Sequence, residues 1–265
     1  MLMLTHTWIL KAFLGPERPL EDHLDLVAYN ICPDFLPISQ SFNSSMTHGV
    51  SRFRAIPRQY RKAAFIVFHL MVDDLSHHGR IEKAPVTDFN PESEGYSYLK
   101  GRSLVEPLMD LYSAHGQSLD YPRAVYRSHM VIEMTFDLSL YQALKEESER
   151  LVLIMCRSLQ EMSGAALEEF GETVGWFYGV EPEAVREAVL LCAERYTLDR
   201  INRFMSLPGR ITLFADKFGL ESSRTTAYDG LRGIMLRGMD LVKDYGDFLD
   251  PTLREIRRAG FAPTF

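Results

Sequence analysis

The chain has 265 residues, of which 46% are hydrophobic, and it carries a formal net charge of -7 with a sequence pI near 5.6. This length and apolar content suffice for a substantial hydrophobic core, whereas the acidic balance argues against a partner such as duplex nucleic acid. The three cysteines are far apart and form no CxxC pair, which indicates neither a disulfide framework nor a thiolate zinc site.

The chain starts with the mildly apolar stretch MLMLTHTWILKAFLG, which has neither the basic start nor the small-residue cleavage site of a signal peptide. No window approaches about 18 uninterrupted apolar residues, so we expect no transmembrane segment. These two observations predict a cytoplasmic protein. No pattern in the sequence predicts an oligomeric state.

Most of the chain shows the apolar periodicity of amphipathic helices, and strand signals are poor, so we expect an all-α fold. Prolines near the starts of two long segments, and Gly79 after the end of one, fit helix boundaries. The predicted helices span residues 20–31, 57–78, 121–144, 145–162, 164–178, 181–205, 209–219 and 226–249. The segments 33–56 and 80–103 are rich in turn-forming and polar residues and are expected to be irregular.

The distribution of histidine divides the chain into two parts. All eight histidines lie in the first half, and none follows His129. We therefore expect residues 1–140 to form a metal-binding catalytic region. Residues 141–265 have ordinary helical composition and are expected to pack on it as support or as a specificity element, within one continuous domain.

The stretch FHLMVDDLSHHG, residues 68–79, carries the densest set of candidate ligands. His69, Asp73 and His77 follow one another at i, i+4 and i+8, which keeps them within about 40° of one line along a helix. The same line continues the apolar face, so these side chains should point inward. Asp74 and His78 lie one step round the helix, where they would support a ligand or contact solvent.

A second pair, His129 and Glu133, has the same i, i+4 spacing within the apolar stretch MVIEMTF. Taken alone, such a histidine fits a hydrogen-bonded core residue, and the stripe on residues 69–77 fits an exposed polar face. Two buried stripes of histidine and carboxylate together need a shared positive charge. Helical proteins supply it with a multinuclear metal site.

Three short motifs upstream add further candidates. Asp34 follows a proline at a helix end in CPDF, and His48 precedes a glycine in MTHG. His6 lies near the chain start in THTW. Histidine and carboxylate ligands without thiolate suit catalytic zinc, and iron or manganese also accept them.

In chain order, the motifs THTW, PD, THG, HxxxDxxxH and HxxxE resemble the zinc-dependent phospholipase C family, which shares its helical fold with the single-strand-specific zinc nucleases. A related domain occurs in glycosylphosphatidylinositol-specific phospholipase D. The resemblance covers about residues 1–135, and residues 140–265 carry no motif of the family. It implies a single all-α domain that hydrolyses phosphoric esters with two or three zinc ions.

The resemblance also implies which residues hold the ions and which take part in catalysis. The implied ligands are Asp34, His48, His69 and Asp73 for the first ion, His77, His129 and Glu133 for the second, and His6, Asp73 and the possible ligand Met1 for the third. Asp73 would bridge two ions, and Asp34 would orient the attacking water. Asp74 and His78 are possible supporting residues. The helical spacing favours His77 over His78 as the ligand.

The expected substrate is a small-molecule or lipid phosphoester. One alternative is an iron-dependent helical enzyme, either an HD-type phosphohydrolase or a di-iron oxygenase. The chain has no adjacent His-Asp pair, and it has HxxxE where a di-iron bundle prefers ExxH. Another alternative is a non-catalytic helical protein with a structural metal site.

Overall fold

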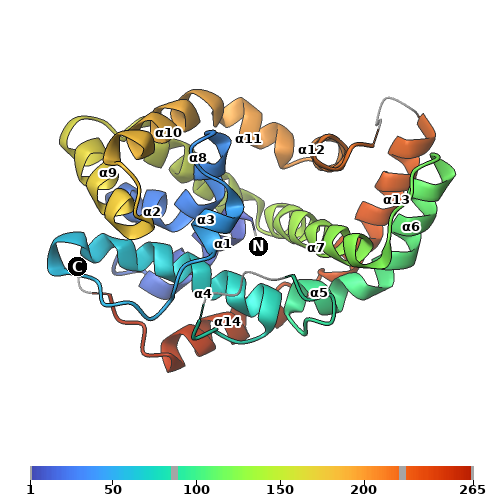
Figure 1. The fold of residues 1–265 in the computed structure, drawn as a ribbon, viewed down its shortest axis with the longest axis horizontal. Coiled ribbons are helices and arrows are strands. Elements are labelled where there is room, and N and C mark those ends of the chain that lie inside the picture. Colours follow the sequence, from blue (N-terminus) through green and yellow to red (C-terminus); the bar gives the residue numbers. More distant parts are fainter. Residues whose placement is uncertain (1, 85–88, 221–224, 264–265) are drawn as a thin grey trace.

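A computed structural model describes residues 2–84, 89–220 and 225–263 and shows the predicted all-α fold, with no strand in these ranges (Figure 1). The helices are α1 (Met3–Leu14), α2 (Leu24–Phe35), α3 (Ser44–His48), α4 (Ala64–His78), α5 (Tyr96–Gly101), α6 (Val105–Ala114), α7 (Tyr121–Ala143), α8 (Lys145–Gln160), α9 (Gly164–Tyr178), α10 (Pro182–Arg195), α11 (Leu198–Phe204), α12 (Leu207–Phe218), α13 (Thr225–Leu241) and α14 (Gly246–Arg258). Short 3₁₀ turns occupy Leu20–Asp22, Leu36–Ile38, Arg58–Ala63 and Arg102–Leu104.

Two of the predicted helices are divided in the structure. The segment 181–205 breaks before Thr197, whose side chain accepts a hydrogen bond from the Arg200 amide and so begins a new helix, α11. The segment 226–249 breaks between α13 and α14, where Asp244 and Gly246 have low helix propensity. The first correction matters for the site, because residues of α11 and α12 line the cavity described below.

Four helices lie where the sequence predicts no helix or an irregular segment. α1 and α6 fall outside the predicted helices, and α5 lies inside the predicted loop 80–103. α2 also continues past its expected end and includes Pro33, which places Asp34 in its last turn. In the predicted irregular segment 33–56, α3 forms one short helix that Asn43 caps by accepting a hydrogen bond from the Met46 amide.

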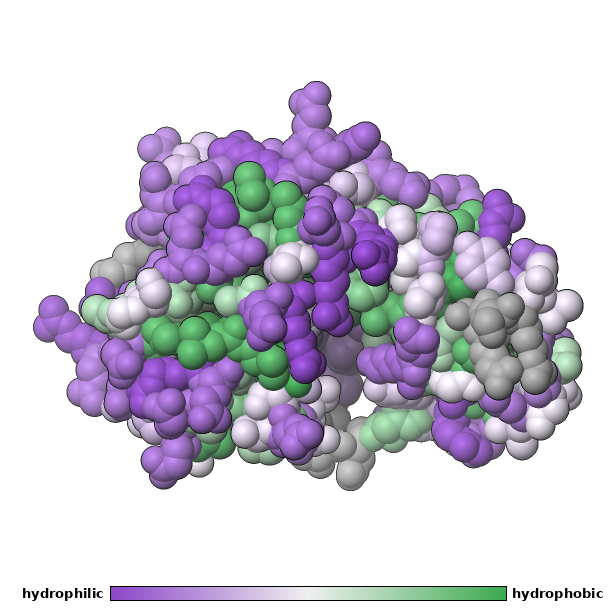
Figure 2. Space-filling model, turned by 90° about the horizontal axis from the view of Figure 1, so that it is seen from above, coloured by the Kyte–Doolittle hydropathy of each residue, from purple (hydrophilic) through white to green (hydrophobic). Residues whose placement is uncertain are grey.

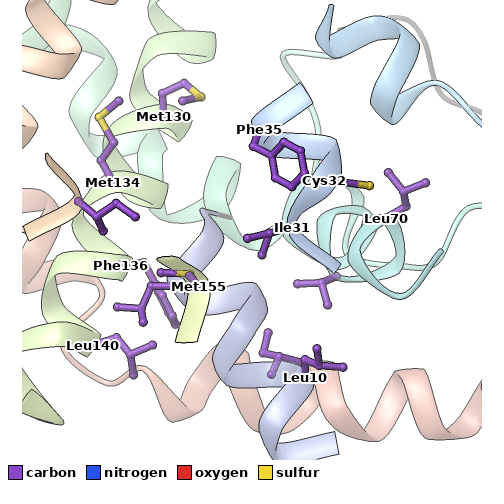
Figure 3. Packing of buried hydrophobic residues seen from close by; sticks show 14 of the residues in the cluster. Leu10, Ile31, Cys32, Phe35, Leu70, Met130, Met134, Phe136, Leu140 and Met155 are labelled. Atoms are coloured by element: carbon purple, nitrogen blue, oxygen red, sulfur yellow. The ribbon is translucent and has the colours of Figure 1, made fainter. Parts of the chain in front are cut away.

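The core lies where α1, α2, α4, α7 and α8 pack together (Figure 3). Leu10 of α1, Ile31 of α2 and Leu70 of α4 are fully buried, as are Phe136 of α7 and, nearly so, Met155 of α8. Burying a side chain of this kind stabilises the fold by about 1.5–3 kcal/mol. The core thus holds together the helices that carry the candidate ligands, and it joins them to the second half of the chain.

Helix α5 packs closely on α4 and α7 because of two glycines. A Cβ atom on Gly95 would lie 2.1 Å from the carbonyl carbon of His77, and one on Gly101 would lie 3.1 Å from that of Ser128. Only a residue without a side chain allows the first approach. The close packing places α5 directly beside the end of α4 that bears His77 and beside the part of α7 that bears His129.

Within the described ranges, none of the helices is both long enough and apolar enough to cross a membrane.

Candidate metal centre

Helix α4 presents His69, Asp73 and His77 toward the interior, as their spacing predicts. His69 and Asp73 are buried, whereas the side chain of His77 is 27% exposed. The helix ends at Gly79, whose left-handed φ of 73° stops it just after His78. The three side chains do not form one set: His69 and Asp73 belong to one end of the centre and His77 to the other.

Asp73 lies between three histidines that come from three different helices. Its Oδ1 is 3.2 Å from Nε2 of His6 on α1, whereas its Oδ2 is 3.2 Å from Nε2 of His69 and 3.3 Å from Nε2 of His48. The two carboxylate oxygens therefore face different partners. This is the arrangement that a carboxylate shared between two metal ions requires.

Asp34 and His48 complete the group around His69. Asp34 Oδ1 lies 3.7 Å from His48 Nε2 and 3.8 Å from His69 Nε2. On the other side of the His48 ring, Nδ1 is 3.0 Å from the Ser44 carbonyl oxygen, which fixes the ring orientation and leaves Nε2 toward the carboxylates. The atoms of Asp34, His48 and His69 are close enough together to hold one metal ion.

A second group forms where the end of α4 meets α7. His77 Nε2 lies 2.7 Å from Glu133 Oε1, and the ring of His129 is perpendicular to that of His77 at a centroid distance of 5.4 Å. Tyr98 of α5 stacks on His129 with centroids 4.5 Å apart, and Ser76 Oγ donates to Glu133 at 3.4 Å. These contacts hold the three candidate ligands in position from outside the group.

His6 and His69 lie face to face, with ring centroids 3.6 Å apart and planes 10° from parallel. The atoms of His6, His69 and Asp73 form a third set that is compact enough for an ion. His69 thus belongs to two of the sets, which the sequence does not predict.

The carboxylates and His48 stabilise one another as charged groups. Burial lowers the pKa of His48, but Asp34 and Asp73 outweigh it and raise the value to about 10. Burial likewise raises the pKa of Asp73, yet the surrounding positive charges, those of His69 and His6 among them, hold it well below its usual range. The same kind of balance, led by His69, lowers the pKa of Asp34.

Two other buried histidines, His69 and His129, have ring nitrogens without hydrogen bonds, and burial disfavours the protonated form of both. Burial lowers the pKa of His69 to about 4 and that of His129 to about 3. Neither ring nitrogen of His69 makes a hydrogen bond, and neither do Nδ1 of His129 and Oδ2 of Asp34. Buried polar atoms are nearly always satisfied in proteins, so these atoms fit a site whose ligand is a cation. The residues present therefore match a histidine and carboxylate metal centre.

The possible supporting residues lie beside the centre in different ways. Asp74 is buried and accepts two hydrogen bonds from Arg52, at 3.0 and 2.7 Å. Arg52 also donates to the carbonyl of His48 at 2.8 Å, so the pair ties the loop after α3 to α4. His78 borders the cavity but belongs to none of the ligand sets, and Met1 lies outside the described residues.

Sequence reasoning missed Asp137, which lies one helical turn beyond Glu133 on α7. Its carboxylate accepts hydrogen bonds from the amides of Leu4 and Thr5 and from the Thr5 hydroxyl, at 3.3, 3.1 and 2.5 Å. It also contacts the buried Arg210 of α12, whose Nη2 lies 3.5 Å away. Asp137 therefore holds the start of α1, and with it His6, against α7. The i, i+4 continuation from Glu133 was the signal that could have identified it.

The centre opens into a cavity of about 510 Å³. Seen from above, the surface is hollowed near the middle of the molecule, and both hydrophilic and hydrophobic side chains border the hollow (Figure 2). Most of the candidate ligands line the cavity: Asp34, His48, Asp73, His77, His129 and Glu133. The aromatic residues Phe89, Tyr98 and Tyr126 and several residues of α11 and α12 complete its wall. A pocket of this size takes a small organic molecule or the head group of a larger one.

No known protein family, curated protein or solved structure matches this chain. The site has to be interpreted from its own chemistry.

Proposed function

We propose that this chain is a metal-dependent hydrolase of phosphoric esters that acts in the manner of the zinc-dependent phospholipase C family. The observation that carries the proposal is the position of Asp73, with one oxygen toward His6 and the other toward His48 and His69. Two ions bridged by one carboxylate are a recurrent device for phosphoester hydrolysis. A purely structural metal site would be closed by its ligands, whereas this one opens into a cavity.

The ligands of the proposed centre follow the three sets of side chains. They are Asp34, His48, His69 and Asp73 for one ion, His77, His129 and Glu133 for another, and His6 with Asp73 for a third. Zinc in such a centre supplies Lewis acidity and lowers the pKa of a bound water. Iron and manganese accept the same ligands, so elemental analysis is needed to identify the metal.

Asp34 and Asp73 have separate roles in the proposed reaction. Asp34 lines the cavity, and its Oδ2 is not engaged in a hydrogen bond, so it can accept a hydrogen bond from a water and orient it toward the ester. Its lowered pKa keeps it ionised and ready to accept at neutral pH. Asp73 keeps the two ligand sets in register, and Ser44 fixes the ring of His48.

The proposed substrate is a small-molecule or lipid phosphoester that fits the cavity, and the proposed location is the cytoplasm. The acidic net charge disfavours an action on anionic membrane surfaces.

The proposal is tested by metal analysis of protein purified without chelator, together with hydrolysis of bis(4-nitrophenyl) phosphate and 4-nitrophenyl phosphate. We expect two or three equivalents of zinc per chain, and less metal and activity in His69→Ala and Glu133→Ala. His115→Ala is the control, because that ring contacts the Leu111 carbonyl and Thr226 on the outside of α6. Unchanged metal content in both site variants would rule the centre out, and iron in place of zinc would favour an iron-dependent enzyme.

A further inference from the structure

One part of the cavity wall comes from the C-terminal half of the chain and is rich in basic side chains. Arg200 lies on α11, and Arg210 and Lys217 lie on α12; all three line the cavity that contains the candidate ligands. Apolar residues of the same helices, Phe204 and Leu213, line the cavity with them. We call Arg200, Arg210 and Lys217 the basic wall.

Two members of the basic wall, Arg200 and Lys217, do not balance the buried acids Asp74 and Asp137 beside the metal centre. Asp74 is paired with Arg52, and Asp137 with Arg210. Arg200 and Lys217 are exposed and make no ion pair with a carboxylate in the described ranges. Two positive charges thus remain available at the cavity for a ligand.

Arg210 adds a buried donor to the same wall. It is only 3% exposed, and its Nη2 contacts Asp137 at 3.5 Å and the sulfur of Met205 at 3.4 Å. Its Nε makes no hydrogen bond, although it is buried. A guanidinium that borders a cavity and has an N–H group without a hydrogen bond is suited to donate to a carboxylate or phosphate oxygen.

Lys217 lies near one of the proposed ligand groups. It lines the same cavity as His77, His129 and Glu133. A ligand in this cavity can therefore contact the basic wall and that group together.

We propose that the basic wall binds a second anionic group of the substrate, so that the substrate is an acidic phosphoester and not one with a quaternary ammonium head group. This inference rests on the proposed function only in taking the reacting group to be a phosphoester. The aromatic residues Phe89, Tyr98 and Tyr126 could attract a cation, but two unpaired positive charges in the same cavity oppose that choice.

The test uses phosphonates, which hydrolysis does not consume. A matched series carries a phosphonate at one end of a short chain and a carboxylate, a methyl or an ammonium group at the other: 3-phosphonopropionate, propylphosphonate and 2-aminoethylphosphonate. A second series with longer spacers covers a greater distance between the two subsites. Binding to zinc-loaded protein is measured by titration calorimetry.

We expect the phosphonocarboxylate to bind about tenfold tighter than the alkylphosphonate, the equivalent of about 1.4 kcal/mol, and the aminophosphonate to bind most weakly. The double variant Arg200→Gln/Lys217→Gln should reduce that preference to less than about twofold, because it removes the exposed charges without touching the buried pair. The control variant Arg203→Gln/Lys243→Gln removes the same charge from residues that do not line the cavity and should keep the preference.

Equal affinity for the carboxylate and methyl ends in both series, or tightest binding of the aminophosphonate, would overturn the basic wall while leaving the phosphoesterase proposal intact. Failure of the phosphoesterase proposal has a different result: no zinc uptake and no phosphonate bound better with zinc than without. In that case the affinity of the phosphonocarboxylate for the metal-free wild type is compared with its affinity for metal-free Arg200→Gln/Lys217→Gln. A higher affinity of the wild type would support the wall, and equal affinity would refute it.

Discussion

Substitution of Asp137 by alanine is the sharpest test of how the site is held together. The carboxylate accepts hydrogen bonds from two amides and one hydroxyl at the start of α1 and faces the guanidinium of Arg210. Burial raises the pKa of Asp137 and lowers that of Arg210, and each group offsets part of this effect in the other. Without the carboxylate, Arg210 becomes a buried charge with no counterion.

Removing one member of a buried ion pair costs about 3–5 kcal/mol, and we expect Asp137→Ala to fall in this range. Arg210→Met leaves the carboxylate with the donors of Leu4 and Thr5 and should cost less, about 1–3 kcal/mol. The double variant Asp137→Ala/Arg210→Met contains no buried guanidinium without a counterion. The double variant should therefore be more stable than the sum of the single effects predicts, by about 1 kcal/mol or more.

The measurement is equilibrium unfolding in urea with chelator present, so that loss of metal does not contribute to the free energy of unfolding. Asp240→Asn is the control: it lies on the surface of α13 in an exposed pair with Lys243 and should change stability by less than about 0.5 kcal/mol. A loss below about 1 kcal/mol in Asp137→Ala, or additive single effects, would refute the reasoning.

Three further predictions concern the centre itself. The raised pKa of His48, about 10, keeps this residue protonated at pH 7 in metal-free protein. Zinc binding there should therefore release a proton, and the zinc affinity should rise by about tenfold from pH 7 to 8. Calorimetry in two buffers measures the proton release, and its absence would contradict the prediction. His77→Ala should remove one metal equivalent and His78→Ala none, as read by elemental analysis; the reverse would place the ligand at 78. Gly95→Ala should cost about 1–3 kcal/mol in urea unfolding because its Cβ would overlap α4, whereas Gly233→Ala, with open space around it, should not destabilise, and equal effects would contradict the close packing.

Helical periodicity was enough to predict the fold class and most of the long helices, because those helices bury one apolar face. It failed where a short element depends on contacts far away in the chain. Helix α5 is an example: its sequence resembles a loop, and it is held on α4 and α7 through Gly95 and Gly101. The break before Thr197 was missed because apolar residues continue across it.

The candidate ligands on α4 and α7 could be named from the sequence because spacing on a helix determines which side chains share a face, whereas His6, Asp34 and His48 were named from short motifs and from the family resemblance. The spacing cannot tell which helices meet. It predicts His69, Asp73 and His77 as one stripe, but the division of this stripe between two groups depends on where α1, α2 and α7 approach α4. The pairing of Asp74 with Arg52 is equally non-local, since Arg52 lies in a segment without regular periodicity.

The hydrogen bonds and the ion pair of Asp137 bear on whether the first half of the chain can fold without the second. The residue belongs to the half of the chain that carries the candidate ligands, but its buried counterion, Arg210, comes from the other half. A fragment cut after residue 140 would keep every named ligand and lose the group that balances the anchor of its first helix. The centre therefore cannot be transplanted as an N-terminal module, and the C-terminal helices are part of what makes the ligand-bearing half foldable.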